Sequence, residues 1–440
     1  MSQFSSAAGA APSAAPKIHA QKISGPKLIA ACTIGNALEF FDFVVYSFFA
    51  ATIGKLFFPA ADPTAQLLLS FATYGVGFFL RPLGGVVLGA YADRRGRKRA
   101  TVLTLMMMAF GTLLIGLAPT YAQIGVFGPM LVIIGRLIQG FSAGGEVGAS
   151  TTLLSESAPK DQRGFYGSWQ LASQGLAVLA AAGIAFAITG LLSKEDVESW
   201  GWRIPFISGI LIVPVGLWLR SALEETHANE AEAGTAQVSS LREVFRGHWR
   251  RLLLGVMLII GGTAANAIIV LYMATYAVRQ LGMPPTSGLM AGLTAGFVTL
   301  VVAPLSGALS DRIGRRPVAG VSYLLIALLI YPAFLLINAS PTLGTLLSVV
   351  AVLAALNAAG GAPSILTLTE IFPTEVRATG MSLVYAVGVA IFGGFGQFIV
   401  TWLIQALATP IAPAYYVMAC CISSLIALSL LPEMARKQLT

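Results

Sequence analysis

Charged side chains are scarce in this sequence of 440 residues: only 10% are Asp, Glu, Lys or Arg, against roughly 25% in soluble domains. Histidine and cysteine are scarce too, at three each, and none has metal-ligand spacing. No phosphate-binding loop of the form G-x-x-x-x-G-K-[ST] occurs. These absences argue against a soluble domain, an enzyme and an ATP-driven pump. We expect neither a metal nor any other cofactor.

Apolar residues are present in excess: 56% of the chain is hydrophobic, and the mean hydropathy is +0.79. A membrane-spanning helix needs about 20 mostly apolar residues. Twelve such runs occur, at 28–53, 66–91, 100–118, 124–154, 165–191, 203–220, 251–279, 287–310, 318–338, 343–369, 377–407 and 411–431. The sequence therefore predicts an all-α integral membrane protein with twelve transmembrane helices.

Lys and Arg are distributed unevenly between the two sides that these spans define. The terminal tails and the even-numbered connections hold 21 of them, the odd-numbered connections hold four, and Arg81 and Arg136 lie inside spans. Because connections rich in Lys and Arg stay in the cytoplasm, we expect both termini there. The net charge of +8 is then a topology signal. We expect membrane lipid, but no nucleic acid, as a partner.

The longest polar connection, 221–250, divides the spans into six and six. The predicted organisation is a flexible cytoplasmic tail (1–26), an N-terminal six-helix half (27–220), a cytoplasmic linker (221–250), a C-terminal six-helix half (251–432) and a second cytoplasmic tail (433–440). Because each chain then holds a whole transport pathway, we expect a monomer.

Two motifs recur in the two halves. "GAYADRRGRKR" at 89–99 is echoed by "GALSDRIGRRP" at 307–317, and the pattern E-x2-P-x3-R occurs at 156–163 and at 370–377. Nearly equal offsets, 218 and 214 residues, indicate an internal duplication with a site between the halves. A basic turn anchored to lipid headgroups is the simpler interpretation of one loop, but the repetition favours gating. The gating candidates are Asp93, Arg94, Arg97, Glu156, Arg163, Asp311, Arg312, Arg315, Glu370 and Arg377.

The first span, "IGNALEFFDFVVY" at 34–46, carries two carboxylates. A charge at the centre of a bilayer helix costs at least ~2.5–3.5 kcal/mol. At helical spacing, Asn36, Glu39, Asp42 and Tyr46 form one polar stripe, which must face protein or water. Arg81, Arg136 and Glu146 are the other charges inside spans of the first half.

These charges have two interpretations. In the first, the carboxylates are structural counter-ions that fix helix packing. In the second, which we favour for the set as a whole, Arg81 and Arg136 attract a substrate carboxylate, while Glu39, Asp42 and Glu146 bind the coupling proton. A carboxylic acid in a low dielectric takes up a proton near neutral pH, whereas an arginine stays charged.

Neutral polar residues complete the predicted substrate site. Tyr166, Gln170 and Gln174 share one face of span five, where hydrogen bonding between helices is an equally good explanation. Asn357 precedes a Gly-Gly-x-Pro sequence that is expected either to break span ten beside the site or to serve close packing. The whole set of substrate-binding candidates is Asn36, Tyr46, Arg81, Arg136, Gln139, Tyr166, Gln170, Gln174, Asn266, Tyr272 and Asn357.

The repeated "GAYADRRGRKR" loop resembles the signature of the major facilitator superfamily. "FFDFVVYSFFA", "RLIQGFSAGGEVG", "ESAPKDQRGFYGSWQ" and "SWGWRIPF" narrow the resemblance to its metabolite:proton symporters, most of all to citrate- and tricarballylate-type members. The resemblance covers essentially the whole chain. It implies two pseudo-symmetric six-helix halves, alternating access, a bacterial inner membrane and uptake of an organic acid with protons.

Other functions stay open at this point. The same branch carries 2-oxoglutarate, shikimate and zwitterions such as proline and betaine. A drug exporter of the superfamily is disfavoured because residues 165–190 contain no proline. A transceptor, which senses substrate without net transport, is the alternative outside transport.

Overall fold

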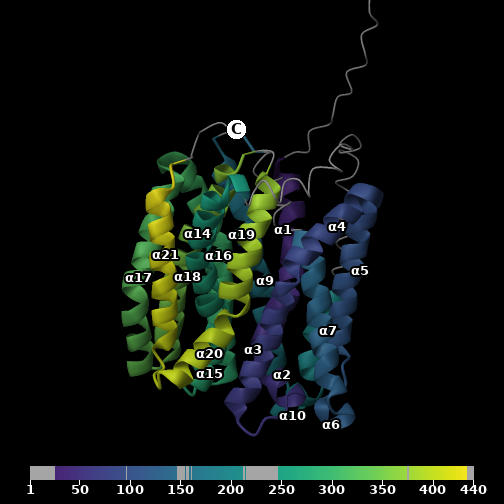
Figure 1. The fold of residues 1–440 in the computed structure, drawn as a ribbon. Helices are drawn as coiled ribbons and strands as arrows, with labels where there is room; N and C mark the ends of the chain where they lie inside the picture. Colours follow the sequence, from purple (N-terminus) through teal and green to yellow (C-terminus); the bar gives the residue numbers. More distant parts are fainter. Residues whose placement is uncertain are drawn as a thin grey trace, which may run out of the picture.

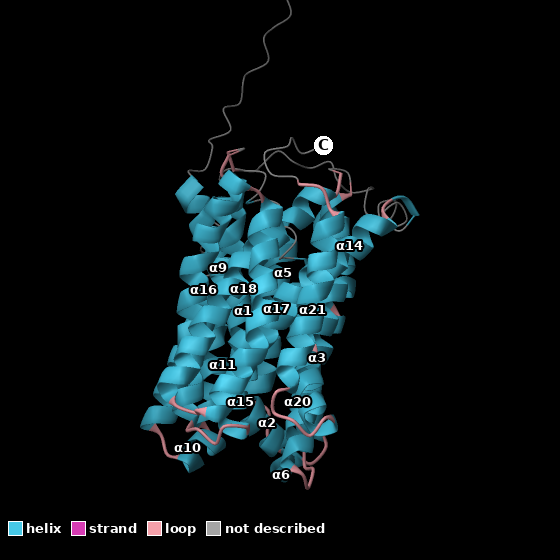
Figure 2. Cartoon of the chain, turned by 90° about the vertical axis from the view of Figure 1, so that its left-hand side faces the viewer, coloured by secondary structure: helices cyan, strands magenta, loops and turns pink. Residues whose placement is uncertain are grey.

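The computed structural model describes residues 25–95, 97–145, 154, 158–159, 161–211, 214, 246–373 and 376–433. Within these residues all regular structure is helical, and no strand occurs (Figure 2). The helices stand side by side along one direction (Figure 1). Such an arrangement is expected in lipid, which offers no hydrogen-bond partners, so that each helix must satisfy its own backbone N–H and C=O groups.

The described elements of the first half are α1 (Gly25–Phe48), α2 (Ala50–Phe57), α3 (Pro63–Phe79), α4 (Arg81–Arg95), α5 (Arg97–Gly116), α6 (Tyr121–Ile124), α7 (Phe127–Ser142), η1 (Ala143–Gly145), α9 (Arg163–Leu191), α10 (Lys194–Ser199), η2 (Gly201–Arg203), α11 (Ile204–Ser208) and η3 (Gly209–Leu211). Those of the second half are α14 (Trp249–Ala265), η4 (Asn266–Tyr272), α15 (Met273–Arg279), α16 (Pro285–Ile313), α17 (Arg315–Ala339), α18 (Leu343–Ile371), α19 (Arg377–Gly388), η5 (Val389–Gly394), α20 (Gly396–Ala406) and α21 (Ala412–Leu430).

The described helices follow the predicted spans closely. Seven are long and apolar enough to cross a membrane, and two bent pairs raise that number to nine. Two shorter apolar helices, Val102–Gly116 and Phe127–Ser142, coincide with predicted spans three and four. Span six begins with α11 and η3, but most of residues 212–220 lie outside the description. The count of twelve and the sidedness of the termini therefore stay predictions.

The two halves lie beside each other, with α3, α4, α5 and α7 in one group and α14, α17, α18 and α21 in the other (Figure 1). They meet along α9 and α16, where small residues let the backbones approach. A Cβ on Gly175 would lie 2.8 Å from the carbonyl oxygen of Gly296, and one on Gly307 would collide with the Gly164 carbonyl. Most of the linker predicted at 221–250, and both terminal tails but for residues 25–26 and 433, lie outside the described residues.

Several spans depart from regular α-helix, and the sequence did not reveal these departures. The first span bends by 63° between α1 and α2, and span eleven bends by 40° beside Phe395. Seven residues of span seven form the π-helix η4, and six of span eleven form the π-helix η5. Such insertions are rare and often mark functional sites.

The break suggested for span ten does not occur, because α18 runs without interruption from Leu343 to Ile371. Pro363 leaves the carbonyl of Ala359 without its usual backbone donor. The Ser306 hydroxyl on α16 donates to that carbonyl at 2.6 Å, so the neighbouring helix satisfies it. The Gly-Gly-x-Pro sequence therefore serves close packing here.

Candidate functional site

A small cavity lies between the two halves and is lined by residues of both. Among the described residues that line the cavity none is charged: Phe40, Tyr74, Phe78, Leu171, Gln174, Ile259, Gly262, Thr263, Asn266, Ala267, Leu271, Tyr323, Asn357, Gly361, Ser364, Ile365, Tyr385, Val389 and Gly393. Both π-helices contribute to the lining, η4 through Asn266 and Leu271 and η5 through Val389 and Gly393.

Three of the predicted substrate residues, Gln174, Asn266 and Asn357, line this cavity. The Oδ1 atom of Asn357 is buried without a hydrogen-bond partner, so it is an acceptor available to a ligand. In the same wall the Tyr323 hydroxyl donates to the Ser364 hydroxyl at 2.9 Å. The lining thus offers amides and hydroxyls rather than ions.

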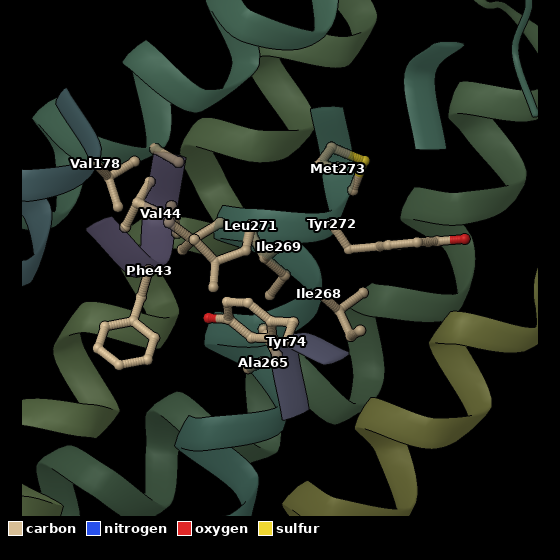
Figure 3. Packing of buried hydrophobic residues seen from close by; sticks show 14 of the residues in the cluster. Phe43, Val44, Tyr74, Val178, Ala265, Ile268, Ile269, Leu271, Tyr272 and Met273 are labelled. Carbon is tan, nitrogen blue, oxygen red and sulfur yellow. The ribbon is translucent and has the colours of Figure 1, made fainter. Parts of the chain in front are cut away.

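Apolar side chains of both halves meet around the cavity. Figure 3 shows the Tyr74 ring of α3 beside Ile268, Ile269 and Leu271 of η4. The Phe71 and Tyr272 rings lie 5.9 Å apart, also across the two halves. These contacts join the two halves beside the cavity.

Arg81 lies just behind the cavity wall. Its guanidinium carbon is 4.2 Å from the centre of the Phe78 ring and 4.7 Å from that of Phe43. The side chain is buried, and its Nε and Nη2 atoms have no hydrogen-bond partner. Its charge interacts with Glu39 and with the cavity residues Tyr74 and Tyr385. Arg81 is therefore a buried positive charge with two unused hydrogen-bond donors, next to a neutral cavity.

Asp42 lies inside the first half and is fully buried, at 0% exposure. Its Oδ2 atom accepts hydrogen bonds from the Thr112 hydroxyl on α5 and, at 3.3 Å, from the Gln139 amide on α7. Its Oδ1 atom has no hydrogen-bond partner, and a Cβ on Gly209 of η3 would collide with it. Four elements, α1, α5, α7 and η3, thus enclose this carboxylate.

Arg136 is joined to Asp42 through Gln139. Its Nη1 donates to the Gln139 amide oxygen at 3.0 Å, and the amide nitrogen of the same residue donates to Asp42. Its Nη2 donates to the backbone carbonyl of Asp42 at 3.4 Å, and its guanidinium carbon stands 3.8 Å from the centre of the Tyr46 ring. Gln139, expected to bind substrate, has both ends of its amide engaged in this bridge.

Glu39 and Glu146 are the other two carboxylates predicted for proton coupling. Glu39 is buried at 4% exposure and interacts electrostatically with Arg81. Glu146 lies outside the described residues. The structure therefore places Glu39 within electrostatic reach of Arg81 and links the Asp42 carboxylate to Arg136 through Gln139.

Several predicted substrate residues make hydrogen bonds between helices instead of lining the cavity. The Asn36 amide donates to Ser173 at 2.5 Å, and the Gln170 amide donates to Asn36 at 2.9 Å, which joins α1 to α9. The Tyr46 hydroxyl donates to the Ser70 carbonyl at 3.2 Å. The alternative left open for span five, bonding between helices, thus describes Gln170, while Gln174 one turn later reaches the cavity.

Two tyrosines complete the predicted substrate set. Tyr272 lies in η4, and its hydroxyl accepts a hydrogen bond of 3.2 Å from Thr401. Tyr166 is half-buried near the start of α9, with its ring 6.0 Å from that of Phe165. Neither residue is among those that line the cavity.

One copy of the repeated gating motif forms a compact ion cluster in the second half. Arg315 is buried and donates to Asp311 at 2.8 Å and to Glu370 at 3.3 Å. Asp311 also accepts hydrogen bonds from the backbone N–H groups of Gly164, at 2.7 Å, and Phe165, at 2.9 Å, in the first half. The start of α9 is thus bound by a carboxylate of the other half.

The other gating candidates lie around this cluster or outside the description. Arg163 begins α9 and interacts electrostatically with Glu370, whereas Arg312 is exposed. Arg94 is exposed at the end of α4. The side chains of Asp93, Arg97 and Arg377 and the whole of Glu156 lie outside the described residues.

Residues of the site that sequence reasoning missed are mostly neutral. Thr112 stands alone in the apolar stretch "MMMAFGTLLIG", and Tyr74 and Tyr323 each stand in an apolar span. A single hydroxyl in a lipid-exposed helix is unremarkable in sequence, because it can bond to the carbonyl four residues earlier. Only a search for every polar atom inside spans would have singled them out.

The chain matches known transporters over most of its length. A family model described as "Sugar (and other) transporter" matches residues 28–228 and 218–440. A citrate-proton symporter of Klebsiella pneumoniae is 39% identical over 90% of this chain and 89% of that protein. A proline/betaine transporter of Salmonella typhimurium is 35% identical, with coverage of 94% and 84%, and an alpha-ketoglutarate permease of Escherichia coli is 36% identical, with coverage of 84% and 85%.

Among solved structures, the inward-open xylose transporter of Escherichia coli has a TM-score of 0.73 at 18% identity and covers 94% of this chain and 98% of that one. This likeness shows the fold, with its two halves. The relatives are bacterial transporters rather than enzymes, and the chain is accordingly a multi-pass protein of the bacterial inner membrane. It belongs to the major facilitator superfamily, in the metabolite:proton symporter branch.

Proposed function

We propose that the chain imports an organic anion, a carboxylate of the citrate or tricarballylate type, together with protons by alternating access. The observation that carries this proposal is Asp42, a fully buried carboxylate joined to Arg136 through one amide. Ionisable groups buried in transmembrane helices often serve as proton relays. The similarity to a citrate-proton symporter supports the same reaction for this chain.

Arg81 is the proposed anchor for a substrate carboxylate. Its Nε and Nη2 donors have no hydrogen-bond partner, and the rings of Phe43 and Phe78 stand close to its guanidinium. A guanidinium does not lose its proton and can hold a carboxylate through two bonds. The amides of Gln174, Asn266 and Asn357 then bond the other oxygens of the anion.

Coupling follows from the change in charge when Asp42 binds a proton. While Asp42 is ionised, its negative charge partly neutralises the positive charge of Arg136. When Asp42 binds a proton this neutralisation is lost, so the positive potential of Arg136 and Arg81 acts on an incoming anion. Proton and anion load together, and the empty, deprotonated carrier returns to its internal pairing. Glu39, which faces Arg81, and Glu146 are the other proposed proton carriers.

The cluster around Asp311 is the proposed cytoplasmic gate. Its carboxylate holds the start of α9 across the two halves, and Arg315 ties it to Glu370. Rocking of one half against the other would break the bonds to Gly164 and Phe165. Such a cluster with two discrete arrangements is what alternating access requires.

A zwitterion such as betaine or proline is the second candidate substrate. The cavity wall contains Phe40, Tyr74, Phe78, Tyr323 and Tyr385. Aromatic faces attract quaternary or secondary ammonium groups, and a proline/betaine transporter is among the relatives. 2-Oxoglutarate and shikimate stay open, and so does sensing without transport, which predicts binding but no accumulation.

The test is uptake of radiolabelled citrate into proteoliposomes with and without an inward proton gradient. We expect accumulation that a protonophore abolishes, and its loss in Asp42→Asn. Asp196→Asn, which changes an exposed carboxylate of α10, is the matched control and should accumulate normally. Equilibration without accumulation in the wild-type protein would rule out proton coupling. If citrate is not taken up, the same assay with 2-oxoglutarate, shikimate, proline and betaine decides the substrate.

Several predictions about the whole chain accompany this function. We propose twelve spans with both termini in the cytoplasm, two six-helix halves at 27–220 and 251–432, a linker at 221–250 and flexible tails at 1–26 and 433–440. We also propose a monomer with lipid as its environment and no nucleic acid as a partner.

A further inference from the structure

The hydroxyl of Thr112 has two hydrogen-bond acceptors within reach. It bonds to Oδ2 of Asp42 and lies 2.9 Å from the backbone carbonyl of Met108, one turn earlier on α5. It also accepts a hydrogen bond of 2.8 Å from the amide nitrogen of Gln139. A hydroxyl has one proton and two lone pairs, so it can donate to only one of the two acceptors at a time.

The two acceptors of the Thr112 hydroxyl correspond to the two protonation states of Asp42, one acceptor for each state. When Asp42 is ionised, the Thr112 proton points to Oδ2, and the Gln139 amide supplies a second donor to the same atom. When Oδ2 carries a proton, that O–H donates to Thr112, whose own proton turns to the Met108 carbonyl. Only one proton is gained by Asp42, no covalent bond of Thr112 changes, and every polar group involved keeps a partner.

The other carboxylate oxygen, Oδ1 of Asp42, has no neighbouring acceptor for a proton among the described residues. Oδ1 is buried without a hydrogen-bond partner, and Gly209 closes against it. A proton on Oδ1 would be a buried donor without an acceptor, which costs free energy. The surroundings therefore direct the proton to Oδ2.

Among the described residues, the other charged or titratable groups near the pair do not offer this exchange. They are Arg136 on α7, Glu39 and Tyr46 on α1, Tyr74 on α3, Arg81 on α4 and Tyr385 on α19. Arg136 reaches the Asp42 carboxylate through Gln139. The neighbours from α5 and η3 are Thr112 and Gly209, which do not titrate in this range.

We propose that Thr112 is a positioning residue for proton coupling: a hydroxyl that turns between Asp42 and the Met108 carbonyl as Asp42 releases or binds its proton. This inference rests on the proposed function, because it assigns the coupled proton to Oδ2 of Asp42. It makes protonation possible without movement of any heavy atom, so that the larger rearrangement is left to substrate binding.

The test compares three variants reconstituted in proteoliposomes over a pH series of substrate exchange. Thr112→Val keeps the shape of the side chain and removes the hydroxyl, whereas Thr112→Ser keeps the hydroxyl. Thr189→Val is the matched control, because its hydroxyl bonds the Ala185 and Phe186 carbonyls of its own helix. Hydrogen bonds to charged groups are the stronger ones, so Thr112→Val loses more from ionised than from protonated Asp42.

We therefore expect the pH midpoint of exchange to move upward by about one pH unit in Thr112→Val. Thr112→Ser and Thr189→Val should keep the wild-type midpoint. An unchanged midpoint in Thr112→Val overturns the proposal, and so does a Thr112→Ser profile that matches Thr112→Val, since the hydroxyl that Ser keeps would then not set the midpoint.

A second readout does not depend on the substrate. Infrared difference spectra across the same pH series report the carbonyl stretch of protonated Asp42, identified by its absence in Asp42→Asn. We expect Thr112→Val to raise that frequency, because the acid loses its acceptor, and Thr112→Ser to leave it near the wild-type value. If no substrate is accumulated, the proposed function fails while this spectrum still decides the role of Thr112. Normal accumulation of substrate by the wild-type protein, with an unshifted carbonyl band in Thr112→Val, would leave the proposed function intact and overturn the proposed role of Thr112.

Discussion

The carboxylate of Asp311, at the end of α16, accepts a hydrogen bond of 2.7 Å from the backbone N–H of Gly164, at the start of α9. The two residues belong to different halves. A helix N-terminus carries unsatisfied N–H groups and partial positive charge, so it favours a carboxylate. Here that carboxylate caps a helix of the opposite half, and the cap is lost whenever the halves separate at this end.

The first prediction concerns this cap. Asp311→Asn keeps one acceptor but removes the charge, and charge-assisted bonds to N–H groups are roughly twice as strong as neutral ones. We expect the equilibrium constant for closure at this end to fall by about tenfold, the equivalent of 1.4 kcal/mol. The measurement is the rate at which a single cysteine near the start of α9 reacts with a membrane-impermeant reagent, which should rise.

The control for this prediction is Asp196→Asn, which removes a carboxylate that bonds only within its own segment, to Ser193 and Trp200. It should leave the labelling rate at the wild-type value. Equal labelling of Asp311→Asn and the wild-type protein would mean that the bond between Asp311 and Gly164 does not hold the gate.

The second prediction separates packing residues from substrate residues. Gln170 donates to Asn36 across α1 and α9, whereas Gln174, on the same face of α9, lines the cavity. Gln170→Ala leaves Asn36 with an unmet acceptor, at a cost of about 1–3 kcal/mol of stability. Gln174→Ala should keep the melting temperature and raise the KM for uptake. Thermal unfolding in detergent and uptake kinetics, measured on both variants, test whether Gln170→Ala affects stability and Gln174→Ala affects KM.

The reverse pattern, a stable Gln170→Ala with a raised KM, would assign Gln170 to the substrate. A loss of stability in both variants would mean that Gln174 also serves helix packing and that the cavity has its polar contacts elsewhere.

The same pair of glutamines shows how far sequence reasoning reaches. Helical spacing correctly places Tyr166, Gln170 and Gln174 on one side of α9, and hydropathy finds the spans that contain them. Which of them meets another helix and which meets a cavity depends on the neighbours α1 and α18, which no local pattern describes. The sequence predicts a polar stripe but not its partners.

Deviations from regular helix were beyond prediction for a related reason. The π-helices η4 and η5 have no strong residue signature, and the Gly-Gly-x-Pro sequence of α18 stays helical because Ser306, on another helix, bonds the freed carbonyl. Asp42 was recognisable because a buried charge is costly wherever it lies. Its bridge through Gln139 was not, since it joins residues 97 positions apart.

The third prediction concerns Arg81. Arg81→Lys keeps the charge but loses the planar group that stacks on Phe78 and Phe43 and that binds a carboxylate through two bonds. We expect the KM for uptake to rise by roughly 10–100-fold, since a hydrogen bond to a charged group is worth about 1.5–3 kcal/mol. The melting temperature should fall little, because Nε and Nη2 have no hydrogen-bond partner to lose. Uptake kinetics and thermal unfolding test both parts.

Arg203→Lys is the matched control for Arg81, since that guanidinium stacks on Trp202 and bonds the Gly116 and Ala118 carbonyls away from the cavity. It should leave KM unchanged. If Arg81→Lys also transports with the wild-type KM, the anion is anchored elsewhere and Arg81 is a structural counter-charge to Glu39.

The fourth prediction uses Asp62, which lies outside the spans at the start of α3. Its side chain accepts hydrogen bonds from the backbone N–H groups of Thr64, at 3.0 Å, and Ala65, at 3.1 Å. These bonds, joined by the charge of Arg279 from the other half, hold the pKa of Asp62 below its ordinary value of 3.8. Because the lowered pKa belongs to the folded state, the ionised cap stabilises the protein above the unfolded value, and its contribution is lost as the pH falls through the folded value.

Asp62→Asn should therefore melt at a lower temperature than the wild-type protein at pH 7, because an amide offers one acceptor and no charge where the carboxylate offers two oxygens. The difference should shrink as the pH falls below about 4 and should close once the pH is below the lowered pKa of Asp62 in the folded protein. Thermal unfolding of both proteins across this range is the measurement, with Asp196→Asn on the six-residue helix α10 as a control. A gap that persists at low pH would show that the substitution acts through packing and not through the charge of the cap.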